Sequence, residues 1–191
     1  MTAAAVCVSL VAMQKKIQMT KPKLLVIGHA RHGKDTVCEI LRDHYGYSFE
    51  SSSRFCSRLF IYNQLKDKYG YTCEEECYAD RHNHRQEWYE AICAYNVPDA
   101  GLLGREIFAA HDIYCGLRNK REYHAMRNTG VFDYAVWVDR SDHLPEEPNT
   151  SMSLAQWMAD FTIDNNGSLE ELRFNVDQLV NYIDHKHGAK V

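Results

Sequence analysis

The sequence lacks an excess of positive charge. Its 22 lysines and arginines stand against 26 aspartates and glutamates, which gives a formal net charge of −4 at pH 7. Proteins that hold nucleic acid along a broad surface usually carry a basic field. Any contact with DNA would therefore have to come from a local group of arginines and lysines.

A paired-cysteine motif is also missing. The seven cysteines form an odd set without a CxxC pair, and a chain of 191 residues does not need disulfides to fold. Reduced thiols in a cytoplasm are the favoured interpretation. The nearest approach to a zinc signature is Cys73 and Cys77 followed by His82 and His84, without a second well-spaced pair. We therefore favour scattered core and surface residues over a zinc site.

The apolar run near the N-terminus is too short to span a membrane. It has about 12 residues, and lysines follow the run instead of preceding it, so we expect neither a membrane span nor a signal peptide. Residues 1–20 are expected to form a loosely ordered extension. With 45% hydrophobic residues, residues 21–191 should form one domain.

Short apolar segments alternate with segments of helical periodicity along the rest of the chain. Strands are expected at residues 23–30, 47–53, 112–117, 133–139 and 161–164. Helices are expected at residues 33–45, 55–69, 80–95, 102–111, 119–127 and 169–185, with a short one at 154–160. This alternation predicts an α/β fold in three layers, with a parallel sheet of about five strands and helices on both faces.

One motif in this pattern carries chemistry. Residues 28–36 read GHARHGKDT and match the phosphate-loop pattern GxxxxGK, between an expected strand and an expected helix. Glycines let backbone N–H groups approach a β-phosphate, Lys34 would bridge the β- and γ-phosphates, and the helix N-terminus adds partial positive charge. A tight turn with a solvated lysine is the alternative. The predicted ATP-binding residues are Gly28, His29, Ala30, Arg31, His32, Gly33, Lys34, Asp35 and Thr36. The motif makes the expected fold that of P-loop NTPases and nucleoside monophosphate kinases.

Three residues are predicted to hold Mg²⁺. Asp35 stands where Ser or Thr would normally do so, but a carboxylate can bind Mg²⁺ directly or through water, and Thr36 is adjacent. Asp139, at the end of an expected strand, is the third candidate, with a strand-end cap as the alternative. Asp35 is also the best-placed carboxylate to accept a proton from an acceptor hydroxyl, and Asp80 is second.

Arginines indicate where anionic groups bind. Arg81 and Arg85 are four residues apart in the expected helix 80–95, so they would share a face that grips phosphates or is simply solvated. Arg118 follows an expected strand, and ligands of open α/β sheets lie beyond the carboxyl ends of strands. The predicted substrate-binding residues are Arg81, Arg85 and Arg118. The predicted catalytic residues are Lys34, Asp35 and Arg118.

Residues 140–156 form the expected lid. Proline, asparagine and serine in a charged stretch predict a mobile loop, and lids of phosphoryl-transfer enzymes close over ATP and exclude water. Arg140 is the candidate there for contacting the transferring group.

With GHARHGKDT, DRHNHRQEWYEAI, DIYCGLRNKRE, VWVDRS and DFTIDNNGSLEEL in view, the chain resembles bacteriophage P-loop kinases of the deoxynucleoside monophosphate kinase superfamily. Within that group it is most similar to the 5-hydroxymethyluracil DNA kinases of phages that hypermodify thymine, over roughly residues 23–183. The resemblance implies ATP and Mg²⁺ as cofactors and phosphorylation of the hydroxymethyl group of 5-hydroxymethyluracil in DNA. It also implies an adenine site beside residues 165–167, for which a plain turn is the alternative.

Two other functions stay open at the level of sequence. A kinase acting on free deoxynucleoside monophosphates would share every residue on the ATP side. An ATP-binding regulatory or assembly protein would lack acceptor chemistry altogether. The expected partners are ATP and either modified DNA or a free deoxynucleotide, the expected location is the cytoplasm of an infected host cell, and the oligomeric state is left open.

Overall fold

A five-stranded parallel sheet forms the centre of the protein in the computed structural model, which describes residues 21–188. The strands are β1 (Leu24–Ile27), β2 (Phe49–Ser51), β3 (Ile113–Cys115), β4 (Tyr134–Asp139) and β5 (Phe161–Asp164). Their order is β2-β3-β1-β4-β5, and every neighbouring pair is parallel. This order, with a phosphate loop directly after the central β1, is that of the P-loop kinase fold. The predicted fold class is confirmed.

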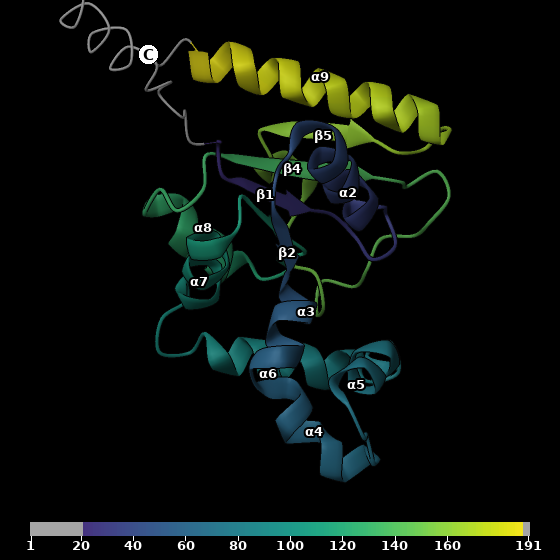
Figure 1. Ribbon diagram of the computed structural model, residues 1–191, viewed down its shortest axis with the longest axis vertical. Coiled ribbons are helices and arrows are strands. Elements are labelled where there is room, and N and C mark those ends of the chain that lie inside the picture. Colours follow the sequence, from purple (N-terminus) through teal and green to yellow (C-terminus); the bar gives the residue numbers. More distant parts are fainter. Residues whose placement is uncertain (1–20, 189–191) are drawn as a thin grey trace, which may run out of the picture.

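Helices surround the sheet and extend beyond one end of it. They are α2 (Lys34–Tyr45), α3 (Ser52–Cys56), α4 (Tyr62–Tyr69), α5 (Glu74–Asp80), α6 (Arg85–Tyr95), α7 (Leu102–Ala110), α8 (Lys120–Asn128) and α9 (Leu169–Gly188). A π-helix at Ser57–Ile61 joins α3 to α4. Helices α3 to α6 gather at the end of the molecule farthest from α9 (Figure 1). Within residues 21–188, no helix has the length and apolar character needed to cross a membrane.

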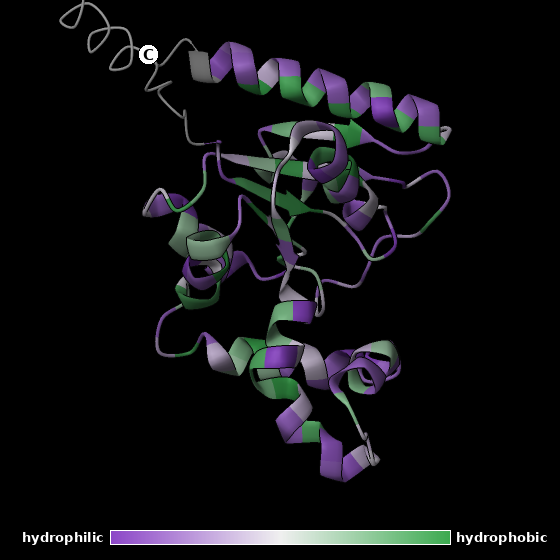
Figure 2. Ribbon diagram, in the orientation of Figure 1, coloured by the Kyte–Doolittle hydropathy of each residue, from purple (hydrophilic) through white to green (hydrophobic). Residues whose placement is uncertain are grey.

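The central strand is buried on both faces. Leu24 and Val26 pack in a cluster with residues of α2 and α9, whereas Leu25 and Ile27 pack in a second cluster with residues of α7 and α8. All four side chains are fully buried. Because successive side chains of a strand point to opposite faces, a strand in a covered sheet has to be apolar throughout. Figure 2 shows this apolar sheet interior and the hydrophilic residues along much of α9.

The helix expected at residues 80–95 is wrong in its first part. Asp80 ends α5, residues 81–84 form a turn, and α6 begins only at Arg85. The Asp80 carboxylate accepts a hydrogen bond from Asn83 Nδ2 at 2.5 Å and lies 3.0 Å from His84 Nε2. Short polar side chains that bind nearby groups in this way favour turns over helix. Arg81 and Arg85 therefore do not share a helical face.

Smaller differences concern where elements begin and end. The helical run expected at 55–69 starts at residue 52, because the Ser51 hydroxyl accepts the Arg54 amide at 3.1 Å and caps the first turn. Strands β2 and β3 are shorter than the segments 47–53 and 112–117 predicted for them. Only a 3₁₀ turn, Gln156–Met158, forms where a short helix was expected at 154–160.

One carboxyl group is buried in the core away from the phosphate loop. The Glu122 side chain lies on α8, and the residue is 5% exposed. Burial in surroundings that solvate charge poorly raises the pKa of this carboxyl to about 7. Glu122 should therefore bind a proton in the folded protein at pH values where the unfolded chain releases it.

We expect Glu122→Gln to remove a pH dependence from the free energy of unfolding. A pKa raised from 4.5 to about 7 contributes stability that is present below pH 4.5 and lost as the pH rises through about 7. Urea unfolding at about pH 5 and about pH 8 should show that the substitution stabilises the protein more at the higher pH. Glu170→Gln, at an exposed position of α9, is the control. Equal effects of Glu122→Gln at both pH values would contradict the assignment.

Candidate active site

The loop between β1 and α2 has a backbone that requires glycine at two positions. The φ angles are 144° at Gly28 and 91° at Gly33, in a region that L side chains rarely adopt. A Cβ at Gly28 would lie 2.5 Å from the Val138 carbonyl oxygen, and one at Gly33 would lie 2.2 Å from Asn165 Nδ2. Gly33 is the N-cap of α2, and no side chain in the described part of the chain caps this helix. Its first-turn amides are thus available to an anion.

Two histidines of the loop bind the segment that follows β4. His32 Nδ1 accepts the Arg140 amide at 2.9 Å, and His29 Nδ1 accepts the Glu147 amide at 3.0 Å. On the other side of the loop, Asn165 Nδ2 donates to the His32 carbonyl at 2.9 Å. Both imidazoles are buried, and burial is the main cause that lowers the pKa of each. A neutral imidazole has one unprotonated ring nitrogen, which can accept the hydrogen bond that each of these backbone amides donates.

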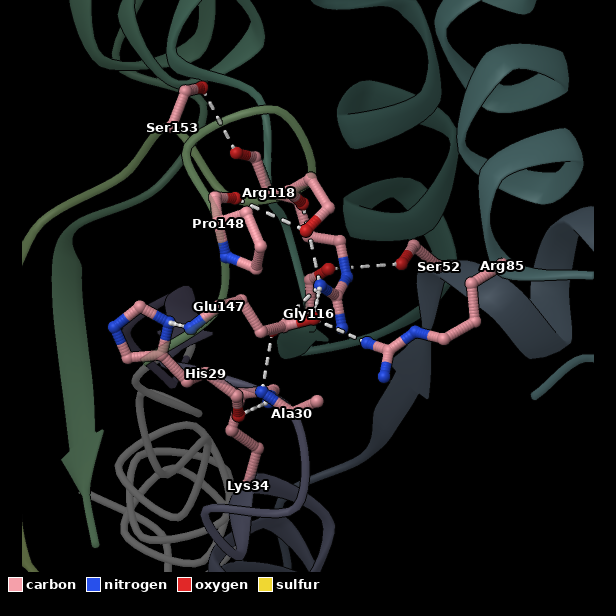
Figure 3. A network of polar contacts seen from close by, with 11 residues as sticks. His29, Ala30, Lys34, Ser52, Arg85, Gly116, Arg118, Glu147, Pro148 and Ser153 are labelled. Carbon is pink, nitrogen blue, oxygen red and sulfur yellow. Dashed lines mark hydrogen bonds and ion pairs between the residues drawn. The ribbon is translucent and has the colours of Figure 1, made fainter. Parts of the chain in front are cut away.

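Lys34 is half-buried and folds back over its own loop. Its Nζ donates to the His29 carbonyl at 2.6 Å (Figure 3). Burial lowers the pKa of this ammonium, and Arg118 acts in the same direction, whereas Asp35 and Glu147 act against them. Because burial destabilises the charged form of Lys34, an anionic partner would stabilise this ammonium. A nucleotide phosphate would be such a partner.

Glu147, for which no role was predicted, lies against the phosphate loop. Its Oε2 accepts the Ala30 amide at 2.6 Å, and its two oxygens lie 2.7 and 2.8 Å from Nη1 of Arg118 (Figure 3). Arg85 forms a second ion pair with it, and the Glu147 side chain is 11% exposed. Burial raises the pKa of this carboxyl, but Arg118, the Ala30 amide and Arg85 together outweigh burial and lower it. The carboxylate is therefore charged at neutral pH.

The three arginines predicted to bind substrate separate into two groups. Arg85 and Arg118 converge on Glu147 from α6 and from the loop after β3. Arg81 instead stacks on the Tyr78 ring, with 3.9 Å from Cζ to the ring centroid, and Nη1 donates to the Tyr78 carbonyl at 2.8 Å. The structure brings two of the three together.

A cavity of about 390 Å³ lies beside α2 and β2, and we call it the Asp35 cavity. It extends along α2 from Asp35 to Arg42, and all three residues of β2 line it. Its walls combine carboxylates, guanidinium groups and aromatic rings, with Arg42 over Phe49 at 5.6 Å and Arg54 over Tyr78 at 4.6 Å. The lining residues are Asp35, Glu39, Arg42, Phe49, Glu50, Ser51, Arg54 and Tyr78.

A second cavity of about 300 Å³ lies on the opposite side of β1, towards β5, and we call it the Thr36 cavity. Its lining residues are Thr36, Arg140, Asn165, Gly167, Leu169 and Leu172. Consecutive residues at the start of α2 thus face different cavities. The segment expected to border adenine, residues 165–167, contributes to this cavity together with Arg140 from the lid.

The predicted metal ligands do not form a protein-only metal site. Within residues 21–188, no group of three or more His, Cys, Asp or Glu side chains could hold a metal ion. Asp139 accepts hydrogen bonds from Ser141 Oγ at 3.0 Å and from Asn166 Nδ2 at 3.3 Å, the contacts of a strand-end cap. Asp35 and Thr36 lie at the start of α2. Mg²⁺ usually keeps several waters and binds one or two carboxylates plus substrate phosphates, so these residues fit a metal that arrives with a nucleotide.

Asp80, the second candidate for the proton acceptor, has other partners. Its carboxylate accepts the Tyr71 hydroxyl at 2.5 Å in addition to the Asn83 amide. These hydrogen bonds, led by the one from Tyr71, lower the pKa of Asp80. The residue lines neither the Asp35 cavity nor the Thr36 cavity. Of the two candidate carboxylates, only Asp35 lines one of these two cavities.

The chain matches no family model and no curated protein sequence, whereas several solved structures resemble it in fold. Shikimate kinase from Bacteroides thetaiotaomicron is 10% identical over 85% of this chain and 98% of its own, with a TM-score of 0.49. Shikimate kinase from Acinetobacter baumannii, in complex with shikimate, is 13% identical over 87% and 95%, with a TM-score of 0.48. A gluconokinase from Sinorhizobium meliloti is 10% identical over 86% and 97%, with a TM-score of 0.43. Likenesses of this degree concern the fold alone, and the resemblance to 5-hydroxymethyluracil DNA kinases stays a prediction.

We expect Gly33→Ala to weaken nucleotide binding by about tenfold or more, because a Cβ there collides with Asn165 and moves the loop amides. Gly70→Ala is a matched control, since Gly70 has a φ of 73° and a Cβ there would meet nothing within 4 Å. Both variants should lose about 1 kcal/mol or more of stability from backbone strain. Calorimetric titration with Mg²⁺ and ATP compares their affinities. Equal affinity of the two variants would rule out the close approach at Gly33 as a requirement for binding.

Proposed function

We propose that this protein is an ATP-dependent kinase that transfers the γ-phosphoryl group to a hydroxyl of a nucleotide-like acceptor. The observation that carries this proposal is that Asp35 and Thr36, the two residues directly after Lys34 of the loop, line two different cavities. A donor nucleoside in the Thr36 cavity and an acceptor in the Asp35 cavity would meet at the loop. Fixing two reactants in this way replaces a bimolecular encounter by a positioned transfer.

The donor side is supported by the arrangement of charge around the loop. The triphosphate would run along the amides of residues 28–36, with the Lys34 ammonium on the β- and γ-oxygens. Arg140 and the backbone of residues 165–167 would border the adenine in the Thr36 cavity. Asp35, Thr36 and Asp139 are the residues proposed to hold Mg²⁺, directly or through water, and the metal supplies charge neutralisation at the phosphates.

The acceptor side is supported by the chemistry of the Asp35 cavity. Asp35 is exposed towards it and stands one residue from the lysine of the loop, so its carboxylate is placed to accept the proton of an attacking hydroxyl. Phe49 and Tyr78 add aromatic rings to the wall of the cavity, and each ring is stacked against a guanidinium group, Arg42 on Phe49 and Arg54 on Tyr78. Arg118, and Arg85 from α6, supply positive charge near the transferring group.

For the acceptor itself we propose 5-hydroxymethyluracil in DNA. The resemblance of the phosphate loop and of the later segments supports this choice, and a base with an exocyclic hydroxyl suits a cavity whose wall holds three carboxylates and two aromatic rings. A base inside a duplex would have to leave the stack to reach Asp35. Because the net charge is −4, the DNA backbone would rely on local arginines.

A free deoxynucleoside monophosphate is the second candidate acceptor. Arg42 and Arg54 both line the Asp35 cavity, and guanidinium groups recognise phosphate in a bidentate manner. This candidate needs no base extrusion.

Incubation with γ-labelled ATP separates the candidates. Label in a duplex containing 5-hydroxymethyluracil supports the DNA kinase, and label in a nucleoside diphosphate supports the monophosphate kinase. Hydrolysis of ATP without transfer to either would favour an ATP-binding regulatory protein and contradict the proposal. Lys34→Ala should abolish transfer while the variant still unfolds cooperatively, because only the ammonium at the phosphates is lost.

We expect Asp35→Asn to lower kcat by about 10² to 10⁴, because the amide cannot accept the acceptor proton, and to leave the Kd for ATP measured without Mg²⁺ nearly unchanged. Glu39→Gln removes the same charge from the wall of the same cavity, one turn along α2, and should reduce kcat far less. The measurements are steady-state kinetics with a working acceptor and binding of ATP at equilibrium. Similar losses of kcat in both variants would show that Asp35 acts only through its charge.

A further inference from the structure

The Glu147 carboxylate makes the contacts that a phosphoryl group makes in a phosphate loop. One oxygen accepts a loop amide, from Ala30 at 2.6 Å, and both oxygens accept from the Arg118 guanidinium. Arg85 adds a second cation on the exposed side. Loop amides and paired arginines are also the groups with which proteins hold phosphate, so carboxylate and phosphate compete for the same donors.

The backbone of the lid on either side of Glu147 is restricted in its conformation. Pro145 and Pro148 flank the pair Glu146 and Glu147, and proline restricts both its own φ angle and the residue before it. The Glu147 amide is bound by His29 at 3.0 Å. The far end of the lid is also held, since the Ser153 amide donates to the Arg118 carbonyl at 3.0 Å.

The Glu147 carboxylate and a γ-phosphoryl group cannot both bind at the Ala30 amide. A γ-phosphoryl group at the Ala30 amide would lie within contact distance of the Glu147 carboxylate, and like charges at that distance repel strongly where solvent is scarce. If the lid instead moves away from the loop, the contacts of Glu147 with Ala30, Arg85 and Arg118 are lost. The lid and the nucleotide therefore exclude one another at this point.

We propose that Glu147 is an intrachain plug of the γ-phosphoryl subsite, which the lid inserts in the nucleotide-free protein and withdraws when ATP binds. The inference rests on the proposed function, because that function assigns the subsite to the γ-phosphoryl group. Withdrawal frees Arg85 and Arg118 for the phosphates at the moment the nucleotide arrives. Because ATP binds only molecules in which the lid is open, the apparent Kd for ATP equals the intrinsic Kd divided by the fraction of such molecules.

The first test needs no nucleotide. Amide hydrogen exchange of residues 141–153 should be about tenfold faster or more in Glu147→Gln than in the wild type, because the neutral amide loses both ion pairs. Glu146→Gln, at the exposed neighbouring position, removes the same charge from the same loop and should leave exchange unchanged. Equal exchange in the wild type and Glu147→Gln overturns the plug.

The second test measures competition. Glu147→Gln should tighten binding of inorganic tripolyphosphate and of ATP by about tenfold or more, without a fall in kcat, whereas Glu146→Gln should not. Unchanged affinities overturn the plug, and so does a fall in kcat at unchanged affinity, which would make Glu147 a group needed for transfer. If neither the wild type nor Glu147→Gln binds ATP, the proposed function fails, and the exchange measurement still decides whether Glu147 holds the lid.

Discussion

The N-terminus of α2, which no side chain in the described part of the chain caps, favours an anion, and the arrangement of the site follows from this preference. Strand β1 is buried on both faces, and the loop that follows it leads into α2, which begins at Lys34 with Gly33 as its N-cap. A convergent set of donors at a helix N-terminus is unfavourable without a negative partner. In the present structure the carboxylate of Glu147 provides part of that partner, and in the proposed reaction a nucleotide phosphate would replace it.

The sheet topology explains why the two cavities lie on opposite sides of this loop. Strand β1 lies between β3 and β4, so the segments after β2 and β5 lie on opposite sides of it. Asp35 and strand β2 line one cavity, whereas Thr36 and the loop after β5 line the other. If one cavity holds the donor and the other the acceptor, as proposed, this separation suits transfer between two bound molecules better than hydrolysis of one.

The parts that the sequence predicted are those with local signals. The apolar run of β1, the GxxxxGK pattern and the periodicity of α2 are contiguous, so the strand, the loop and the helix could be predicted without knowledge of the fold. The turn at residues 81–84 interrupts an expected helix because Asp80 binds the side chains of the residues three and four positions later. In the sequence alone, the helical periodicity of this segment is a stronger signal than the turn preference of Asp80. The position of Glu147 depends on Ala30, which is 117 residues away in the chain. Nothing in the local sequence distinguishes Glu147 from Glu146.

The contacts of the two loop histidines also could not be predicted from the local sequence. His29 and His32 were predicted only as members of an ATP-binding loop, whereas each also accepts a backbone amide from the segment after β4. That segment follows a strand adjacent to β1, so this role becomes visible only once the strand order is known. The lid is accordingly more firmly attached than its polar, proline-containing sequence suggested.

The proposed kinase activity needs the amides and the lysine of residues 28–36 to bind the phosphates of ATP. Amide NMR spectra recorded during titration with Mg²⁺ and a non-hydrolysable ATP analogue measure this binding residue by residue. We expect saturable shifts of resonances from residues 30–36 together with those from residues 165–167. Saturation with shifts confined to other regions, or no shifts at all, would contradict the proposed binding.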